Sequence, residues 1–226
     1  MKSALLALLA LCVSVTSATS ASASDCDRLQ GESKQKFEWG ETVILTEAVP
    51  DMPWPKVWVF KRVEAMPEEA AAVFWDVEYQ TTYLAEQGVT KAEIRNGRGT
   101  ATVDVYYELD LPALVGDDAY TVRDTLTAPA GDAYRVGWTM LGESRHSRSS
   151  VGYAKFEPQA AATCMVYYNL VHPKSGLAGL PLIRKQGIEK VGQTALAIAR
   201  QAEAERTRDA ERLRNQVARL RAALGR

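Results

Sequence analysis

The middle of the chain alternates apolar and polar residues in a pattern typical of antiparallel strands. Between positions 100 and 111 the apolar residues share one face of a predicted strand: Val103, Val105, Tyr107, Leu109 and Leu111. The Asn96-Gly97 pair before this run favours a two-residue hairpin turn. Further strands are predicted at 57–63, 89–95, 119–128, 134–140, 148–156 and 163–171. Consecutive strands joined by tight turns predict an antiparallel meander.

Helical periodicity flanks this β section on both sides. Met66-Pro67-Glu68-Glu69 is a helix start, because proline is tolerated in the first turn and acids suit its positive end. A second short helix or turn is expected at 79–86. After the strands, apolar residues spaced three and four apart predict one long amphipathic helix: Ile188, Val191, Ala195, Ile198 and Ala202. Gly187 and Gly192 in this helix either allow close packing on the sheet or leave room for a ligand.

The first 23 residues have the features of a secretory signal peptide. Lys2 precedes an apolar run at 4–15, and Ala21-Ser22-Ala23 supplies an A-x-A cleavage site. The apolar run is shorter than the roughly 20 residues that span a bilayer. We therefore expect an exported bacterial protein, periplasmic or secreted. Its expected parts are a signal peptide at 1–23, a polar segment and arm at 24–54, a folded domain at 55–204 and a basic amphipathic helical tail at 205–226.

Charge and cysteine content limit the possible partners. The chain has 27 basic and 28 acidic residues, a balance that gives no reason to expect a nucleic-acid partner. Cys26 and Cys164 remain after removal of the leader, and an exported protein can join them in a disulfide. The alternative is a loose N-terminus that carries Cys26 and a free, buried thiol at Cys164. The sequence contains no metal, nucleotide or nucleophile motif, so we expect no cofactor.

The C-terminal segment is strongly basic. From Arg206 onward it holds seven arginines and two acids, and Leu213, Val217, Leu220 and Leu224 repeat at a 4-3-4 spacing. Such a helix can make transient contact with an anionic membrane, with its leucines in the interface. It can also pair with another helix or fray in solvent. The sequence leaves the oligomeric state open.

The order of elements resembles the START-like superfamily, also called SRPBCC or helix-grip. The stretches that carry the resemblance are VFKRVEAMPEE at 59–69, FWDVEY at 74–79, the strand at 103–112 followed by YTVRD at 120–124, and PKSG at 173–176. The resemblance implies an α+β fold in which a curved antiparallel sheet of about six to seven strands, with two short helices after the first strand, wraps around a long C-terminal helix. It also implies an internal cavity, and many members bind lipids, sterols or polyketides there.

The residues expected to line this cavity are mostly large side chains on the apolar strand faces, although each could equally be plain core. They are Phe74, Val105, Tyr107, Tyr120, Val122, Asp124, Trp138, Met140, Tyr153, Met165, Tyr167, Gly187 and Val191. If Asp124 points inward, its carboxylate needs a partner or a raised pKa. It would then orient a ligand headgroup or hydroxyl, or serve as a general acid or base. The alternative is that Asp124 lies on a solvated outer face or in a structural ion pair.

Three functions follow from these features. The first is non-catalytic carriage or sensing of a hydrophobic ligand of lipid, sterol or fatty acyl type outside the cytoplasm. The second is a cyclase or aromatase acting on a polyketide-like substrate. The third is an interaction module that uses the basic tail while the cup serves only as core.

Overall fold

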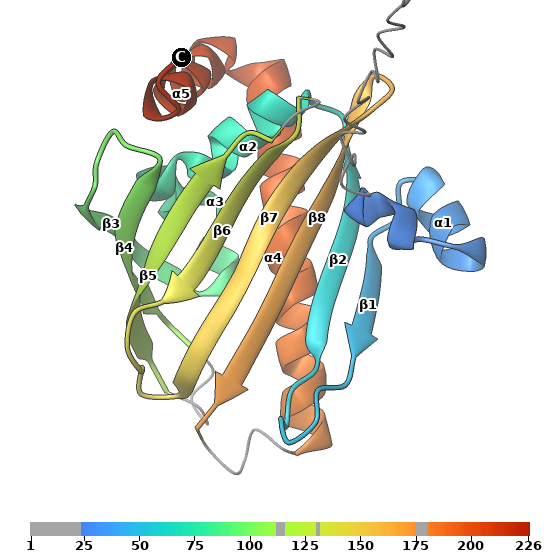
Figure 1. The fold of residues 1–226 in the computed structure, drawn as a ribbon, viewed down its shortest axis with the longest axis vertical. Coiled ribbons are helices and arrows are strands. Elements are labelled where there is room, and N and C mark those ends of the chain that lie inside the picture. The colour runs from blue at the N-terminus through green and yellow to red at the C-terminus, as the bar shows by residue number, and fades with distance from the viewer. Residues whose placement is uncertain (1–23, 112–115, 130–131, 175–179) are drawn as a thin grey trace, which may run out of the picture.

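The computed structural model describes residues 24–111, 116–129, 132–174 and 180–226. The expected signal peptide lies outside the described residues. The chain forms an antiparallel sheet of eight strands in the order β1-β2-β8-β7-β6-β5-β4-β3 (Figure 1). The strands are β1 Val43–Glu47, β2 Lys56–Val63, β3 Val89–Asn96, β4 Thr102–Leu109, β5 Asp118–Thr127, β6 Tyr134–Met140, β7 Ser147–Gln159 and β8 Ala162–Pro173.

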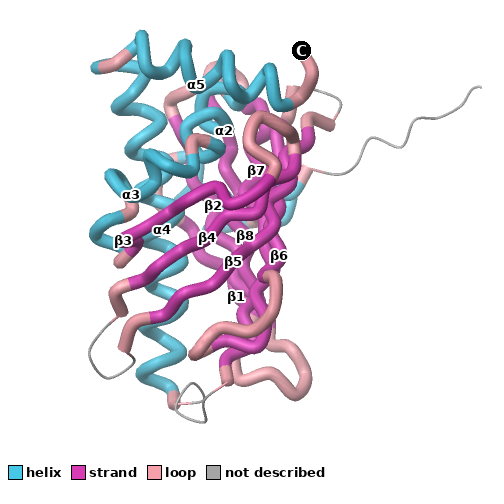
Figure 2. The backbone as a smooth tube through the Cα atoms, turned by 90° about the vertical axis from the view of Figure 1, so that its left-hand side faces the viewer, coloured by secondary structure: helices cyan, strands magenta, loops and turns pink. Residues whose placement is uncertain are grey.

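The helices are α1 Gly31–Glu38, α2 Pro67–Trp75, α3 Gln80–Tyr83, α4 Pro181–Arg208 and α5 Ala210–Ala223, with short 3₁₀ turns at Asp25–Arg28, Val77–Tyr79 and Ala85–Gln87. Helices α2, α3 and α4 cover one face of the sheet, which we call the inner face (Figures 1 and 2), whereas α1 lies on the outer side. The expected α+β helix-grip architecture is confirmed. The sheet has one strand more than expected, because the arm at 43–47 pairs with β2 as edge strand β1.

Local chemistry explains where these elements begin and turn. The Glu69 carboxylate accepts a hydrogen bond from the Met66 backbone N–H at 2.8 Å, and Pro67 follows as the first residue of α2. Gly97 in the β3–β4 hairpin has φ +74°, and a Cβ there would collide with the Thr102 carbonyl. In β4, Val103 and Val105 are buried on the inner face, as the alternation predicts.

The larger core lies between the inner face and helices α2 and α4. Phe74 of α2, Val105 of β4, Met165 of β8 and Ile198 of α4 belong to one buried cluster. The long C-terminal helix therefore packs on the sheet as predicted.

A second, smaller core lies on the outer face of the sheet, beneath the N-terminal segment. Leu29 and Phe37 pack there against Trp58 and Phe60 of β2. Cys26 is joined to Cys164 of β8 by a disulfide, with 6.6 Å between the two Cα atoms. The polar segment at 24–38 is thus folded against the sheet by apolar contacts and a covalent bond.

The basic C-terminal segment does not project as a separate tail. Helix α4 continues past position 204 to Arg208, and α5 then folds back to pack against α2 (Figure 2). Leu213 and Leu220 are buried in this contact. Within the described ranges, no helix combines the length and apolarity needed to cross a bilayer.

Candidate ligand-binding site

The strand register gathers large side chains on the inner face. Tyr107 of β4 pairs with Tyr120 of β5, and their ring centroids are 5.8 Å apart. Four residues further along β5, on the same face, Asp124 pairs with Trp138 of β6. Because alternate residues of a strand share a face, Tyr120, Val122 and Asp124 all point toward the helices.

An aromatic group joins the sheet to α2. The Trp138 ring lies 5.0 Å from the Tyr167 ring of β8, and Phe74 of α2 lies 6.3 Å from Trp138 and 6.4 Å from Tyr167. Gly152 of β7 lies opposite Trp138 in the register, and a Cβ there would collide with the indole. Because residue 152 has no side chain, the indole can lie across β7 and contact Tyr167 of β8.

Burial divides the predicted cavity residues into two groups. Val105, Val122, Met140, Met165 and Phe74 are buried. Four inward-facing aromatic residues are only partly buried: Tyr107, Tyr120, Trp138 and Tyr167. The second group thus retains accessible surface although it faces the helical layer.

Asp124 lies among these aromatic side chains. It is only 5% exposed and makes no hydrogen bond or ion pair with any residue that the structure describes. Burial, with a smaller contribution from the charge of Asp104, raises the pKa of its carboxyl from 3.8 to about 7. An uncompensated carboxyl in such surroundings favours its neutral form or a bound partner.

The tyrosine hydroxyls complete a polar cluster. Burial raises the pKa of Tyr107, Tyr120 and Tyr167, and the nearby Asp124 charge adds to each shift. The Tyr107 hydroxyl donates to Gln80 Oε1 at 2.8 Å, and Gln80 Nε2 donates to the Phe74 carbonyl at 2.9 Å. Within the described part of the chain, the hydroxyls of Tyr120 and Tyr167 have no hydrogen-bond partner. The Asp124 carboxyl and the hydroxyls of Tyr120 and Tyr167 are therefore polar groups on the inner face that have no hydrogen-bond partner among the described residues.

Two predicted cavity residues lie elsewhere. Tyr153 is on the outer face, where its hydroxyl donates to Asp25 Oδ2 at 3.2 Å and its ring stacks on Tyr168. The alternation of β7 places Ala154 and Phe156 inward, so residue 153 points outward.

Gly187 packs against Trp54, whose ring would lie 2.5 Å from a Cβ at that position. Close packing, rather than ligand space, explains this glycine. Val191 is partly buried beside the inner core.

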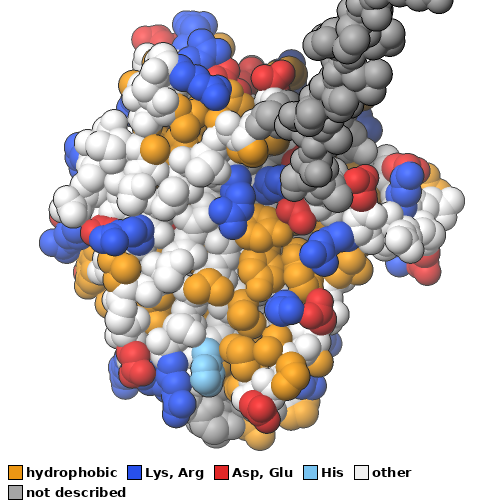
Figure 3. Space-filling model, viewed as in Figure 1, with side chains coloured by type: hydrophobic (Ala, Val, Ile, Leu, Met, Phe, Trp, Pro, Cys, Tyr) orange, Lys and Arg blue, Asp and Glu red, His pale blue; other side chains and the backbone are white. Residues whose placement is uncertain are grey.

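The outer face also carries aromatic surface. Trp58, Tyr168 and Tyr153 lie side by side on β2, β8 and β7, and hydrophobic side chains gather over this part of the face (Figure 3). Arg28 lies over the Trp58 ring at 4.9 Å, and Arg135 over the Tyr153 ring at 4.5 Å. These cation–π contacts partly cover the rings.

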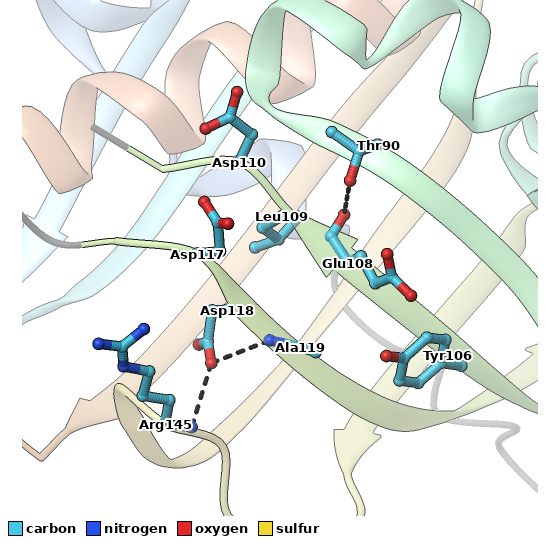
Figure 4. A pocket seen from close by; sticks show the side chains of 9 residues that line it. All are labelled: Thr90, Tyr106, Glu108, Leu109, Asp110, Asp117, Asp118, Ala119 and Arg145. Atoms are coloured by element: carbon cyan, nitrogen blue, oxygen red, sulfur yellow. Dashed lines mark hydrogen bonds between the residues drawn. The ribbon is translucent and has the colours of Figure 1, made fainter. Parts of the chain in front are cut away.

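Two open pockets, each of about 680 Å³, lie outside the inner layer. One is at the end of β4 and β5, where Glu108, Asp110, Asp117 and Asp118 gather with Arg145 (Figure 4). There Asp118 accepts hydrogen bonds from the Ser144 hydroxyl and the Arg145 backbone. The other lies between α2 and α5. None of the predicted cavity residues lines either pocket.

Sequence reasoning missed Gln80 and Gly152. A glycine inside a strand pattern signals close approach of another group, so Gly152 could have been noticed. Gln80 carries no sequence signal, because a polar residue in a short helix is ordinarily exposed. In the ranges described, no three His, Cys, Asp or Glu side chains cluster as metal ligands would.

A curved antiparallel sheet that packs against a long C-terminal helix, with two short helices after the second strand, defines the START-like, or helix-grip, fold. The chain has this fold. A STAR-related lipid transfer protein from Xanthomonas axonopodis superposes with a TM-score of 0.62 at 15% identity, over 71% of this chain and 93% of that one.

Two further solved structures show the same architecture. The Zhui aromatase/cyclase from Streptomyces sp. R1128 has a TM-score of 0.56 at 18% identity, with 69% of this chain and 97% of that chain covered. Human StAR-related lipid transfer protein 5 has a TM-score of 0.50 at 13% identity, with 72% and 83% covered. No protein-family model matches the chain, and no curated protein matches it in sequence.

Proposed function

We propose that this protein binds a hydrophobic ligand of lipid, sterol or fatty acyl type between the inner face of the sheet and its helices, for carriage or sensing outside the cytoplasm. The observation that carries the proposal is the buried carboxyl of Asp124, which, like the hydroxyls of Tyr120 and Tyr167 on the same face, has no hydrogen-bond partner among the described residues. A buried polar group without a partner costs roughly 1–3 kcal/mol or more. A ligand hydroxyl that donates to Asp124 and accepts from a tyrosine would offset this cost.

The surroundings of Asp124 favour an apolar ligand body. Trp138, Tyr167 and Phe74 form a continuous aromatic surface around the carboxyl. Apolar walls with a few converging polar groups are the usual form of a small-molecule site. The names of two similar structures, both lipid transfer proteins, agree with this ligand class.

A location outside the cytoplasm is supported by two features. The leader-like sequence at 1–23 is one. The Cys26–Cys164 disulfide is the other, because such bonds persist mainly in oxidising compartments.

Ligand titration with a matched pair of compounds tests the site. A long-chain alcohol should bind more tightly than the alkane of the same length, and Asp124→Ala should remove most of that preference. Loss of one hydrogen bond to a charged or polar group corresponds to roughly 10-fold or more in affinity. Glu47→Ala, which removes an exposed carboxylate from edge strand β1, is the control and should leave binding unchanged. A protein that purifies empty and binds neither compound would refute the proposal.

An enzyme of cyclase or aromatase type is the second candidate. The pKa of Asp124, about 7, suits a general acid or base at neutral pH, and one similar structure is an aromatase/cyclase. Asp124→Asn would then abolish turnover of a polyketide-like substrate while retaining its binding. Binding without turnover in the unaltered protein decides for the carrier.

A further inference from the structure

Helix α5 lies across α2 at one end of the sheet and packs against both α2 and α4 (Figures 1 and 2). Leu213 and Leu220 are its buried apolar residues, and Val217 and Leu224 are partly buried beside them. Ala223 also packs against the core, and the Arg212 guanidinium lies 4.4 Å from the centre of the Tyr79 ring. The opposite side of the helix faces solvent.

The rim of the contact consists of exposed ion pairs. Arg221 binds Glu68 at 2.6 Å and Arg219 binds Asp76 at 2.7 Å, with the two arginine side chains 55% and 61% exposed. The carboxylates are only 23% and 17% exposed, but the arginine side of each pair is open to solvent, to screening by salt and to competing anions. The same guanidinium groups can bind another anion, such as a phosphate, with equal or better geometry.

The polar groups beneath α5 are incompletely satisfied. Gln216 donates to Asp76 at 3.0 Å, but its Oε1 is buried without a partner. Glu205, 2% exposed, accepts from Gln201 through Oε1, which also lies 3.6 Å from the Arg212 guanidinium of α5, while its Oε2 is buried without a hydrogen-bond partner. Both acceptors would regain hydrogen bonds to water if α5 moved away. The hydrogen bonds that these two acceptors would then make to water offset part of the free energy needed to detach α5 from α2.

A single non-helical residue joins α5 to α4. Asp209 has φ −141° and ends α4 at Arg208, while its side chain caps α5 by accepting from the Arg212 N–H at 3.1 Å. The cap belongs to α5 itself, so the helix keeps its N-terminal cap in any orientation. Rotation about this residue moves α5 as a unit.

The released helix would have the properties of an interfacial one. Its stripe of Leu213, Val217, Leu220 and Leu224 becomes available, flanked by arginines that the acids of α2 no longer hold. Arg208 and Arg214 already lack an acidic partner among the described residues. Apolar residues on one face and arginines on the other fit an anionic bilayer surface.

We infer that α5 is a detachable membrane-binding helix that exchanges its place on α2 for the surface of an anionic phospholipid bilayer. The inference does not depend on which ligand the inner site binds. Departure of α5 uncovers α2, whose Phe74 contacts the aromatic group around Asp124. Membrane contact and access to the inner site would thereby be coupled.

Cross-linking tests whether release is required. Asp76→Cys with Gln216→Cys, joined by a short bismaleimide, would hold α5 on α2, since these side chains are in hydrogen-bond contact. Asp76→Cys alone, treated with the same reagent, is the control. The unaltered protein and the control should co-sediment with vesicles of phosphatidylcholine and phosphatidylglycerol, but not with phosphatidylcholine alone. The cross-linked protein should bind roughly 10-fold more weakly or worse.

Charge removal gives an independent measurement. Arg208→Gln with Arg214→Gln breaks no ion pair of the docked helix, yet it should weaken vesicle binding by roughly fivefold for each arginine removed. Equal binding by cross-linked and free protein would overturn the inference, as would equal binding to neutral and anionic vesicles or no binding to either.

Discussion

Asp124 faces Trp138 across the β5–β6 pair, and both side chains lie on the inner face of the sheet. A carboxyl is therefore buried beside an indole, with no cation beside it in the described ranges. The neighbouring cation, Arg123, points to the outer face, where its Nε donates to Asp104 Oδ1 at 2.8 Å. Burial of this carboxyl without a partner lowers the free energy of unfolding of the ligand-free protein. A ligand group that hydrogen-bonds to Asp124 would offset this cost.

Asp124→Asn should stabilise the ligand-free protein, and increasingly so at higher pH. The folded-state pKa is raised to about 7, whereas the unfolded chain titrates near 3.8. Ionisation of Asp124 therefore opposes folding: its penalty is absent below about pH 4, grows by about 1.4 kcal/mol for each pH unit above that, and is complete above pH 7. The full gain is on the order of 4 kcal/mol. Urea unfolding of both proteins between about pH 4 and 8 measures it.

Asp104→Asn is the control for this measurement. The hydrogen bond from Arg123 lowers the pKa of Asp104, so its ionised form favours folding. Its replacement should bring no gain in stability as the pH rises. A flat pH dependence for Asp124→Asn would show that the carboxyl is hydrated in solution.

Tyr107→Phe and Tyr120→Phe should differ in stability although each removes one hydroxyl from the same face. Tyr107 donates to buried Gln80, so its loss leaves that amide unsatisfied and should cost about 1–3 kcal/mol. Tyr120 has no partner in the described structure, so its loss should be nearly neutral without ligand. Thermal unfolding distinguishes the two. The same cost for both would mean that Tyr120 also has an internal partner.

Gly187→Ala should destabilise the protein, despite the better helix propensity of alanine. The new Cβ would lie 2.5 Å from the Trp54 ring, which must move. In a Trp54→Ala background the same substitution should instead stabilise by up to about 1 kcal/mol, since only the helix propensity remains. A double-mutant cycle in urea measures this reversal of sign. Additive effects would show that the two residues do not touch.

Cys26→Ser with Cys164→Ser should lower the free energy of unfolding by about 2–5 kcal/mol, because the bridge constrains a long loop of the unfolded chain. Urea unfolding with and without reductant provides the check. Reductant should move the midpoint of the unaltered protein to that of the double variant and leave the variant unchanged. If reductant did not change the unfolding midpoint of the unaltered protein, the result would contradict the presence of the disulfide.

The elements that were predicted from the sequence are those encoded by a pattern within their own residues. The strict alternation in β4 and the proline-acid start of α2 each encode one element, and the order of elements resembles one fold. The pairing of β1 was missed, because five residues at an edge carry little periodicity. Partner choice by an edge strand depends on tertiary contact.

The candidate site was predicted less completely, because it depends on strand phase and side-chain direction. For Asp124 the sequence left two alternatives, an inward carboxyl that needs a partner or a raised pKa and a solvated or ion-paired outer one, and the structure buries it on the inner face. Tyr153 was assigned to the wrong face, since β7 is polar at its start and gives no clear phase. The contact of α5 with α2 was also missed: an amphipathic basic helix looks the same in sequence whether its stripe meets a membrane or its own domain.

The bond between Cys26 and Cys164 closes a covalent ring across a sequence separation of 138 residues. Strands β1 to β7 and helix α2 lie inside that ring, and helices α4 and α5 lie outside it. The bond therefore ties the N-terminal segment covalently to β8 and places no covalent restraint on α4 or α5, so a displacement of these two helices would leave the cross-link between the N-terminal segment and the sheet intact.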